Sequence, residues 1–314
     1  MPPSKTEALG REAERTIAEG SKSFAAAARL FRPAMRRDAT LLYAWCRHCD
    51  DVTDGQRLGH GRHQPADAEA VARLKADSLA ACIGEPRDAL PFRALAEVAV
   101  RHELPLEVVT DHLAGFERDV EGWRPASLDE LLEYCYFVAG AVGILMARIM
   151  GVTEQTTLAR ASDLGLAFQL TNIARDAVED ARADRCYIPT DWLHEAGIDS
   201  EEISRPEAAA RAYPLVCRLV EIAEPYYASA RIGERALPAR AAWAIATARS
   251  VYRDIGLKVR RKGPSGLAQR MHTSNGRKVW RVTTGGVQTL AGRVSRRSNA
   301  AARNGLWTPS VLAR

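Results

Sequence analysis

Helical periodicity runs along almost the whole chain. Alanine, leucine, arginine and glutamate dominate the sequence, and these residue types favour helix. Aromatic residues make up only 6% of the 314 residues, and alternating runs of β-branched residues are nearly absent. With 46% hydrophobic residues, the chain is long enough to bury a large core. We therefore predict an all-α protein.

Turn residues and capping signals divide this pattern into separate helices. Ser127 and Glu130 form the capping-box pattern that opens a helix ending near Met150, and residues 55–67 form a loop rich in glycine and histidine. The other expected helices cover residues 6–30, 34–53, 67–83, 88–102, 105–120, 153–182, 207–232 and 238–261, and a further short helix opens at Asp199. Since no linker divides the chain, we expect one domain over residues 1–265 and a basic, partly disordered C-terminal extension over residues 266–314.

An unbroken apolar run covers Phe137–Ala147 and stops at Arg148. About 20 residues are needed to cross a bilayer, so this run predicts a buried helix. Its small residues, which include Ala139 and Gly143, fit close packing between helices. They also fit a smooth apolar wall for a long hydrocarbon, and the pattern does not separate the two interpretations.

The cysteines and the N-terminal segment indicate a reduced, cytoplasmic protein. The six cysteines show no disulfide framework, and the first 20 residues are charged and lack an apolar signal segment. Cys46 and Cys49 form a C-x-x-C pair, but the sequence has no second pair that would complete a zinc site. We interpret them as two semi-buried thiols on a helix.

Charge is distributed unevenly along the chain. The net charge is +5, yet the 60 residues after Asp254 contain 13 basic and no acidic residues, whereas residues 1–254 contain 31 basic and 39 acidic ones. A basic end binds nucleic acid, anionic lipid or a phosphorylated substrate. Because no nucleic-acid motif accompanies it, we favour a membrane surface or substrate phosphate, with a solvated tail as the alternative.

Four aspartates form two matched pairs. Asp50 and Asp54 are four residues apart in one expected helix, and Asp176 and Asp180 are four apart in another. At this spacing the two carboxylates lie on the same helix face, where they repel by roughly 0.2–0.5 kcal/mol in an isolated helix. A repulsive pair that recurs beside basic residues indicates a divalent cation. Two such clusters predict a metal-rich site that grips a polyphosphate.

Both helices carry further polar residues on the face of the aspartates. An ordinary surface helix can show one such stripe, but two independent copies argue against coincidence. The second stripe contains Gln169, Asn172, Asp176 and Asp180, and the first contains Tyr43, Arg47, Asp50 and Asp54.

Oxygen ligands in this number suit Mg²⁺, which takes one or two carboxylates together with phosphate oxygens. Arg47 and Arg175 would offer fork-shaped donors to the same phosphates. The sequence contains no P-loop, no G-x-S-x-G and no H-E-x-x-H motif, which argues against ordinary nucleotide handling, serine hydrolysis and zinc proteolysis. The pattern favours Mg²⁺-assisted departure of a diphosphate inside an apolar helical bundle, whose walls keep water from the resulting carbocation.

Several separated segments carry a specific combination of motifs. They are S-K-S-F (21–24), Y-A-W-C-R (43–47) followed by D-D-V-T-D (50–54), Y-C-Y-F-V-A-G-A-V-G (134–143), Q-L-T-N-I-A-R-D-A-V-E-D (169–180) and R-C-Y-I-P (185–189). Together they resemble the squalene/phytoene synthase family, most closely its bacterial phytoene-forming branch, from about Ser21 to Arg261. The departures are Thr53, at a position that is usually apolar, and a loose match beyond residue 265, so Arg270 and Lys278 are weak candidates for substrate or lipid contacts.

The resemblance implies a single-domain isoprenoid-synthase bundle with a central apolar cavity. It implies a Mg²⁺-dependent prenyltransferase, with Mn²⁺ as an alternative and without NADPH. Such an enzyme condenses two geranylgeranyl diphosphates head to head, through prephytoene diphosphate, to phytoene in carotenoid biosynthesis. In this family one substrate ionises and alkylates the other, and a second ionisation, rearrangement and proton loss give the hydrocarbon.

The resemblance also assigns roles to individual residues. Tyr134 and Asp119 would lie near the carbocation steps. The Mg²⁺ ligands would be Asp50, Asp54, Asn172, Asp176 and Asp180, and the contacts to the diphosphate or the reacting allyl group would be Ser21, Lys22, Tyr43, Arg47, Gln169, Arg175 and Tyr252.

A hydrocarbon product must reach lipid, so we expect a cytoplasmic enzyme bound peripherally to a membrane through its basic tail. Prenyl diphosphates are the expected partners, together with other enzymes of the isoprenoid and carotenoid pathway, and we expect no nucleic acid.

Two other functions share parts of the pattern. A C30 enzyme that makes dehydrosqualene, presqualene diphosphate or squalene from farnesyl diphosphate would carry every motif above, because chain length depends on cavity depth. Some relatives act in the assembly of protein complexes and have lost the aspartates, whereas both pairs are intact here.

Overall fold

The structure is a computed structural model that describes residues 9–15, 28–55, 66–267 and 303–313. Within these residues the secondary structure is helical, without strands, as predicted. The main helices are α3 (Pro33–Asp54), α4 (Ala68–Cys82), α5 (Leu90–His102), α6 (Leu106–Val120), α7 (Leu128–Cys135), α8 (Ala141–Ile149), α9 (Gln155–Arg182), α10 (Thr190–Ala196), α11 (Ala209–Gly233) and α12 (Ala239–Lys262).

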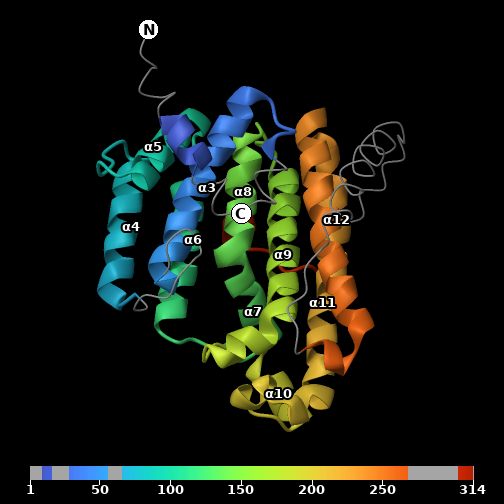
Figure 1. Ribbon diagram of the computed structural model, residues 1–314. Helices are drawn as coiled ribbons and strands as arrows, with labels where there is room; N and C mark the ends of the chain where they lie inside the picture. The colour runs from blue at the N-terminus through green and yellow to red at the C-terminus, as the bar shows by residue number, and fades with distance from the viewer. Residues whose placement is uncertain (1–8, 16–27, 56–65, 268–302, 314) are drawn as a thin grey trace.

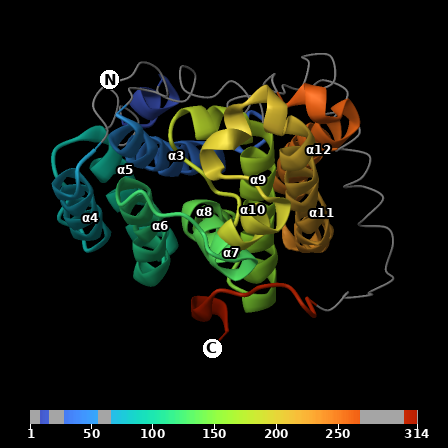
Figure 2. The same ribbon diagram turned by 90° about the horizontal axis from the view of Figure 1, so that it is seen from below.

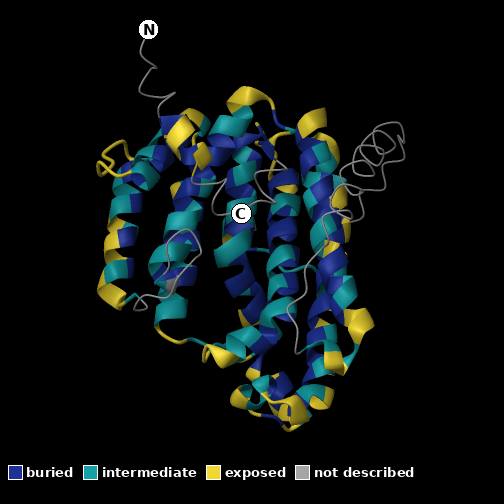
Figure 3. Ribbon diagram, viewed as in Figure 1, coloured by how far each residue is buried: buried dark blue, intermediate teal, exposed yellow. Residues whose placement is uncertain are grey.

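The long helix α9 is the centre of the bundle. It packs against α8, α11 and α12, while α3 packs against α5, α6 and α8, and α4 covers α5 and α6 at one edge (Figure 1). Buried residues face the interior of the bundle, and exposed ones gather at its ends and outer faces (Figure 3). One hydrophobic core therefore extends through the described helices.

The ends of several helices follow local sequence signals. Pro33 occupies the first turn of α3, where its missing N–H is not needed, and Gly55 ends the helix with a φ of 59°. Asp199 and Glu202 form a reciprocal capping box that opens the short η2 (Ser200–Ser204). The sequence did not predict α10, whose two buried residues, Trp192 and Leu193, are too few to produce a period.

A π-helical turn, η1 (Tyr136–Gly140), separates α7 from α8 where the sequence predicts one continuous helix. Two glycines explain why these helices approach α9 so closely. A methyl group on Gly143 would collide with the backbone of Ala161, and one on Gly165 would collide with the backbone of Ala139. Small residues here therefore set the packing distance.

The apolar stretch Leu128–Ile149 covers α7, η1 and α8. Among the described residues it alone is long and apolar enough to cross a membrane by length and composition. More than half of its most apolar window (56%) is buried inside the protein, as in the core helix of a water-exposed bundle, so its composition is weak evidence for a membrane span.

The last described segment returns to the bundle. Residues 303–313, which include η6 (Ser310–Leu312), lie along one side, against α9 (Figure 2). Arg303 donates two hydrogen bonds to the buried Asp163 of α9, at 2.8 and 2.6 Å, and the ring of Trp307 packs on Tyr136 of η1. The rest of the expected extension, with Arg270 and Lys278, lies outside the described residues.

Candidate active site

A cavity of about 960 Å³ runs through the middle of the bundle, between α3, α6, α8, α9 and α12. On α9 its lining extends from Thr157 to Asp180, which corresponds to about 35 Å along the helix axis. Asp176 and Asp180 belong to the last turns of α9 and Asp50 belongs to the last turns of α3. Carboxylates therefore gather at one end of the cavity, and apolar side chains line most of the rest.

The predicted site residues that the structure describes all line this one cavity. They are Tyr43, Arg47, Asp50, Asp119, Tyr134, Gln169, Asn172, Arg175, Asp176, Asp180 and Tyr252. Ser21, Lys22 and the side chain of Asp54 lie outside the described residues. Residues more than 200 positions apart in the chain are thus brought to the same hollow.

On α9, arginine and carboxylate side chains alternate at the acidic end. Arg175 forms a two-pronged ion pair with Asp176, in which Nε donates to Oδ1 at 2.8 Å and Nη2 to Oδ2. Burial, and then the neighbouring carboxylate of Asp176, raise the pKa of Asp180 to about 7. Arg185 and Arg175 oppose this rise in pKa but do not cancel it. Asp180 is therefore only partly ionised at neutral pH, chiefly because it is buried.

On α3, Arg47 joins two acidic neighbours. Its Nη2 lies 3.2 Å from Asp50 Oδ2, and its Nε lies 3.1 Å from Asp51 Oδ1. The side chain of Asp50 is 46% exposed, whereas that of Asp51 is 12% exposed. Asp50 thus faces the open end of the cavity, and Asp51 serves to hold the arginine.

A cluster of aromatic residues surrounds Asp119 beside the carboxylates. Tyr134 Oη donates to Asp119 at 2.9 Å, and Tyr187 Oη donates to the same Oδ1 at 2.9 Å. The ring of Tyr134 is stacked between those of Trp123 and Tyr187, with centroids 5.5 and 5.0 Å away. Burial is the main cause that raises the pKa of both tyrosines, so both hydroxyls stay protonated at neutral pH.

Two observations fit the α9 residues to a divalent cation. Asn172 Oδ1 is buried and finds no hydrogen-bond partner among the described residues. The raised pKa of Asp180 reflects two desolvated carboxylates one helical turn apart, which a cation would relieve. No group of three or more acidic, histidine or cysteine side chains in the described part of the chain forms a ready-made metal site.

The middle and far parts of the cavity are largely apolar. The ring of Tyr252 on α12 is stacked on Phe168 of α9 with centroids 4.2 Å apart, and Val138, Ala139 and Gly143 form the opposite wall. The small residues in Phe137–Ala147 therefore pack closely and also line the hollow, and their role as a wall for a hydrocarbon stays a prediction. Glu234 lies at the far end, where Arg249 donates to it at 2.5 Å.

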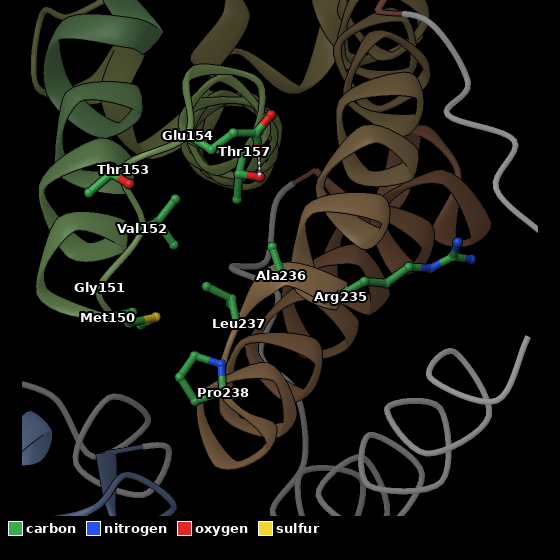
Figure 4. A pocket seen from close by; sticks show the side chains of 10 residues that line it. All are labelled: Met150, Gly151, Val152, Thr153, Glu154, Thr157, Arg235, Ala236, Leu237 and Pro238. Atoms are coloured by element: carbon green, nitrogen blue, oxygen red, sulfur yellow. Dashed lines mark hydrogen bonds between the residues drawn. The ribbon is translucent and has the colours of Figure 1, made fainter. Parts of the chain in front are cut away.

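A second hollow of about 640 Å³ lies outside the far end of the cavity, between the α8–α9 loop and the turn before α12 (Figure 4). Met150, Thr157 and Leu237 line both spaces, so these side chains separate the cavity from the surface.

Sequence reasoning left several residues in or beside the cavity without a role. Arg185 and Tyr187 line the acidic end, and Asp51 holds Arg47. The R-C-Y-I-P segment was a signal for the first two, because its arginine and tyrosine follow the second aspartate pair directly. His112 and Phe116 of α6 also line the cavity, and no motif pointed to them.

Comparison with known proteins agrees with this geometry. The sequence model of the squalene/phytoene synthase family matches residues 17–277. The chain belongs to this family. Two bacterial relatives match the chain over nearly their whole length. A phytoene synthase from Pseudescherichia vulneris is 48% identical over 302 residues, which cover 95% of this chain and 97% of the relative. A 15-cis-phytoene synthase from Paracoccus sp. is 47% identical over 293 residues, covering 93% of this chain and 95% of the relative.

Solved structures of the squalene/phytoene synthase family share the fold. A dehydrosqualene synthase crystallised with a ligand superposes with a TM-score of 0.81 at 25% identity, covering 91% of this chain and 98% of its own. A squalene synthase from Alicyclobacillus acidocaldarius superposes with a TM-score of 0.73 at 22% identity, covering 83% and 96%. The helical bundle is therefore the isoprenoid-synthase fold that the sequence predicted.

Proposed function

We propose that this protein joins two geranylgeranyl diphosphates head to head, through prephytoene diphosphate, to give phytoene with release of diphosphate. The observation that carries this proposal is the 46–48% identity to bacterial proteins named phytoene synthase or 15-cis-phytoene synthase, over more than 90% of the chain. The cavity has the matching chemistry, with carboxylates and arginines at one end and apolar walls beyond them. The protein would thus be a prenyltransferase of carotenoid biosynthesis.

Asp50, Asp54, Asn172, Asp176 and Asp180 would hold Mg²⁺, which neutralises charge that develops on a departing diphosphate. Arg47, Arg175 and Arg185 line the same end of the cavity and carry donors for phosphate oxygens. In this proposal Arg47 and Arg175 exchange part of their present contacts with carboxylates for contacts with the diphosphate. Ser21, Lys22, Tyr43, Gln169 and Tyr252 complete the proposed substrate contacts.

Asp119 and its two tyrosines would orient the reacting ends of the chains. Because both Oη atoms donate to one carboxylate, the rings are fixed with their stacked faces beside the carboxylate end. Aromatic faces attract cations within about 6 Å. Tyr134, whose two faces are covered by Trp123 and Tyr187, would hold the Tyr187 ring in place. The outer face of Tyr187 would stabilise positive charge on the allylic carbon after ionisation, and the apolar walls would exclude water from it.

The test is product analysis of the purified protein with Mg²⁺, offering geranylgeranyl and farnesyl diphosphate separately and omitting NADPH. We expect a C40 hydrocarbon with a central triene from the first substrate alone. A C30 product alone would reject the phytoene assignment and leave a dehydrosqualene or presqualene diphosphate synthase. Absence of any hydrocarbon, with Mg²⁺ or Mn²⁺ present, would reject the enzymatic function.

We further propose that the enzyme works in the cytoplasm on a membrane surface, which it contacts through its basic C-terminal extension. The support is the chemistry of the product, a hydrocarbon that water does not dissolve, and the absence of acidic residues after Asp254. Anionic lipid headgroups attract such segments by about 1 kcal/mol per basic residue.

A further inference from the structure

One histidine in the cavity wall has a ring nitrogen that the described fold does not engage. His112 lies on α6, on the same helix face as Phe116 and Asp119, and all three line the cavity. At 1.5 Å per residue, His112 is about 10 Å further along α6 than Asp119. It therefore belongs to the apolar part of the cavity, next to the cluster of Asp119, Tyr134 and Tyr187.

The two ring nitrogens of His112 have different surroundings. Nδ1 lies 3.0 Å from the carbonyl oxygen of Phe137 in the π-helical turn, and a carbonyl only accepts, so Nδ1 carries the proton. Nε2 is buried and has no hydrogen-bond partner in the part of the chain that the structure describes. The residue is 1% exposed. The ring is thus held in one tautomer, with a lone pair on Nε2.

Leaving that lone pair without a partner is unfavourable. A buried polar atom without a hydrogen bond costs about 1–3 kcal/mol. Burial also lowers the pKa of His112 to about 4, so the ring is neutral at physiological pH and able to accept a proton. Such an unsatisfied group in a folded protein calls for an explanation, and a role in chemistry is one of the recognised ones.

The surroundings of His112 suit a carbocation. The ring centroid of Phe116 lies 5.0 Å from that of His112, and the ring centroid of Trp45, on α3, lies 5.2 Å from it. Both contacts are edge to face. Phe116 lines the cavity, and its π face attracts a cation within about 6 Å. A cationic carbon held against Phe116 would therefore lie beside the imidazole.

The other basic groups in the cavity wall either have a hydrogen-bond or ion-pair partner or, like Asp180, lie at the acidic end. Asp119 accepts hydrogen bonds from Tyr134 and Tyr187, and Glu234 is paired with Arg249. Asp50 and Asp176 are paired with arginines at the acidic end. Among the described residues that line the cavity, His112 offers a neutral nitrogen base in the apolar region.

We propose that Nε2 of His112 accepts the proton lost in the last carbocation step, and this inference rests on the function proposed above. The C–H bond next to the cationic carbon breaks, its electron pair becomes the π bond of the new central double bond, and the proton binds Nε2 to give an imidazolium. The imidazolium then passes the proton to the departing diphosphate or to water. A weak base suffices, because a C–H bond next to a carbocation is strongly acidic.

The test compares His112→Phe with His48→Phe in the full-length protein. Phenylalanine keeps a ring at position 112 and removes the lone pair. His48 is a matched control, since it packs edge to face on Phe92 and does not line the cavity. The readouts are the rate at which geranylgeranyl diphosphate is consumed and the rate at which hydrocarbon and C40 alcohols form.

We expect His112→Phe to consume substrate at a rate within about threefold of that of the control. Hydrocarbon should form about 100-fold more slowly, which is the lower end of the range typical for loss of a general base. The missing carbon should appear as alcohols, because water captures a cation that is not deprotonated. A fall in consumption and in hydrocarbon by the same factor, or an unchanged ratio of hydrocarbon to alcohol, would overturn the role of His112.

A second variant guards against misfolding. His112→Gln keeps an N–H that can donate to the Phe137 carbonyl and places a much weaker base in the cavity, and we expect the same shift towards alcohols. If His112→Phe fails to fold, as judged by circular dichroism, the ratio measured for His112→Gln decides. If the unmodified protein makes no hydrocarbon, the proposed function itself fails. If it does and both variants keep its product ratio, only the inference about His112 fails.

Discussion

Asp176 and Asp180 stand one turn apart near the end of α9, and burial makes their repulsion stronger than it would be on a surface helix. The raised pKa of Asp180 records this, since burial and Asp176 both oppose its ionisation. Asn172, one turn earlier, has a buried carbonyl oxygen without a partner in the described part of the protein. Individually each feature is unfavourable, and in the proposed function a bound cation and a phosphate would relieve them together.

Replacing Asp176 by asparagine tests the proposed role of this carboxylate in binding a cation. The amide keeps the shape of the carboxylate but removes its charge. We therefore expect diphosphate release to slow by at least about 100-fold, because mutating even an outer-shell partner of a metal can reduce activity by about that factor. The matched control is Asp77→Asn on α4, whose partner is the exposed Arg87. A continuous assay of diphosphate release at saturating Mg²⁺ measures both, and equal rates would contradict the metal role.

His112 makes a separate prediction for stability. Its pKa is about 4 in the folded protein and ordinarily 6.5, so between these values the unfolded chain binds more protons and stability rises with pH. We expect this residue's contribution to be fully present above pH 6.5 and to fall by about 2 kcal/mol between pH 7 and pH 5.

Urea unfolding at pH 7 and pH 5 measures this dependence. His112→Phe should reduce the difference in unfolding free energy between the two pH values by that amount, whereas His48→Phe should reduce it less, because His48 is only partly buried. Identical pH dependence in the unmodified protein and His112→Phe would show that the histidine is not held neutral.

At the scale of elements, the segment α7–η1–α8 determines the shape of the cavity. The π-helical turn leaves the carbonyl of Phe137 available to His112, and Arg118 of α6 lies over the Phe137 ring at 4.7 Å. Glycines on both sides let α8 and α9 approach until backbone meets backbone. Interior packing of this density tolerates little added volume.

Gly143→Ala should therefore be destabilising although alanine favours helix. The added methyl group would meet the backbone of Ala161, and overpacking of this kind costs about 1–3 kcal/mol. We expect the melting temperature to fall by several degrees and the yield of hydrocarbon per substrate to fall as the wall shifts. The control is Gly10→Ala in the helical residues 9–15, where a methyl group meets only the flexible side chain of Arg37. A melting temperature for Gly143→Ala at or above that of the control would refute the close approach.

At the scale of the whole molecule, residues 303–313 bind to the central helix of the bundle, α9. Asp163 is 1% exposed and accepts two hydrogen bonds from Arg303 and one from Ser229. Arg303 also donates to the carbonyl of Trp307, which fixes the segment that carries the indole onto Tyr136. A segment 140 residues away in sequence thus supports the helix that carries the second aspartate pair.

Removing one member of this ion pair should destabilise the protein more than replacing both members. Arg303→Met leaves a buried carboxylate without its cation, and such losses cost about 3–5 kcal/mol. Adding Asp163→Asn removes the stranded charge, so the double variant should be more stable than Arg303→Met alone. Chemical denaturation of the two variants and the parent checks the order, and equal stability of the two variants would mean that the carboxylate is solvated.

The proposed membrane contact is also a property of the whole chain. Arg293, Arg296 and Arg297 lie outside the described residues, and their replacement by glutamine removes three positive charges from the extension. At about 1 kcal/mol per charge, partition onto anionic vesicles should weaken on the order of 100-fold. The control replaces Arg73, Arg87 and Arg93, which already pair with acidic neighbours. Equal partition of the two triple variants in a flotation assay would show that the extension does not make the membrane contact.

Much of the fold could be predicted because it is encoded locally. The expected helix over residues 34–53 is α3 (Pro33–Asp54), and that over residues 238–261 is α12 (Ala239–Lys262), because caps, glycine and proline act within one or two turns. The π-helical turn within residues 127–150 was missed because Phe137–Ala147 is apolar throughout, so no polar residue marks the change of helix face that an extra residue in one turn produces.

The candidate site divides in the same way. The sequence by itself determined which helix faces carry carboxylates, since a spacing of four residues fixes a common face whatever surrounds the helix. Only the tertiary structure decided that Asp119 joins Tyr134 to Tyr187, that Arg303 reaches Asp163, and that His112 has a buried Nε2 without a hydrogen-bond partner among the described residues. These contacts depend on the distance and angle between helices far apart in the chain. Packing sets those quantities, and no periodicity within one segment records them.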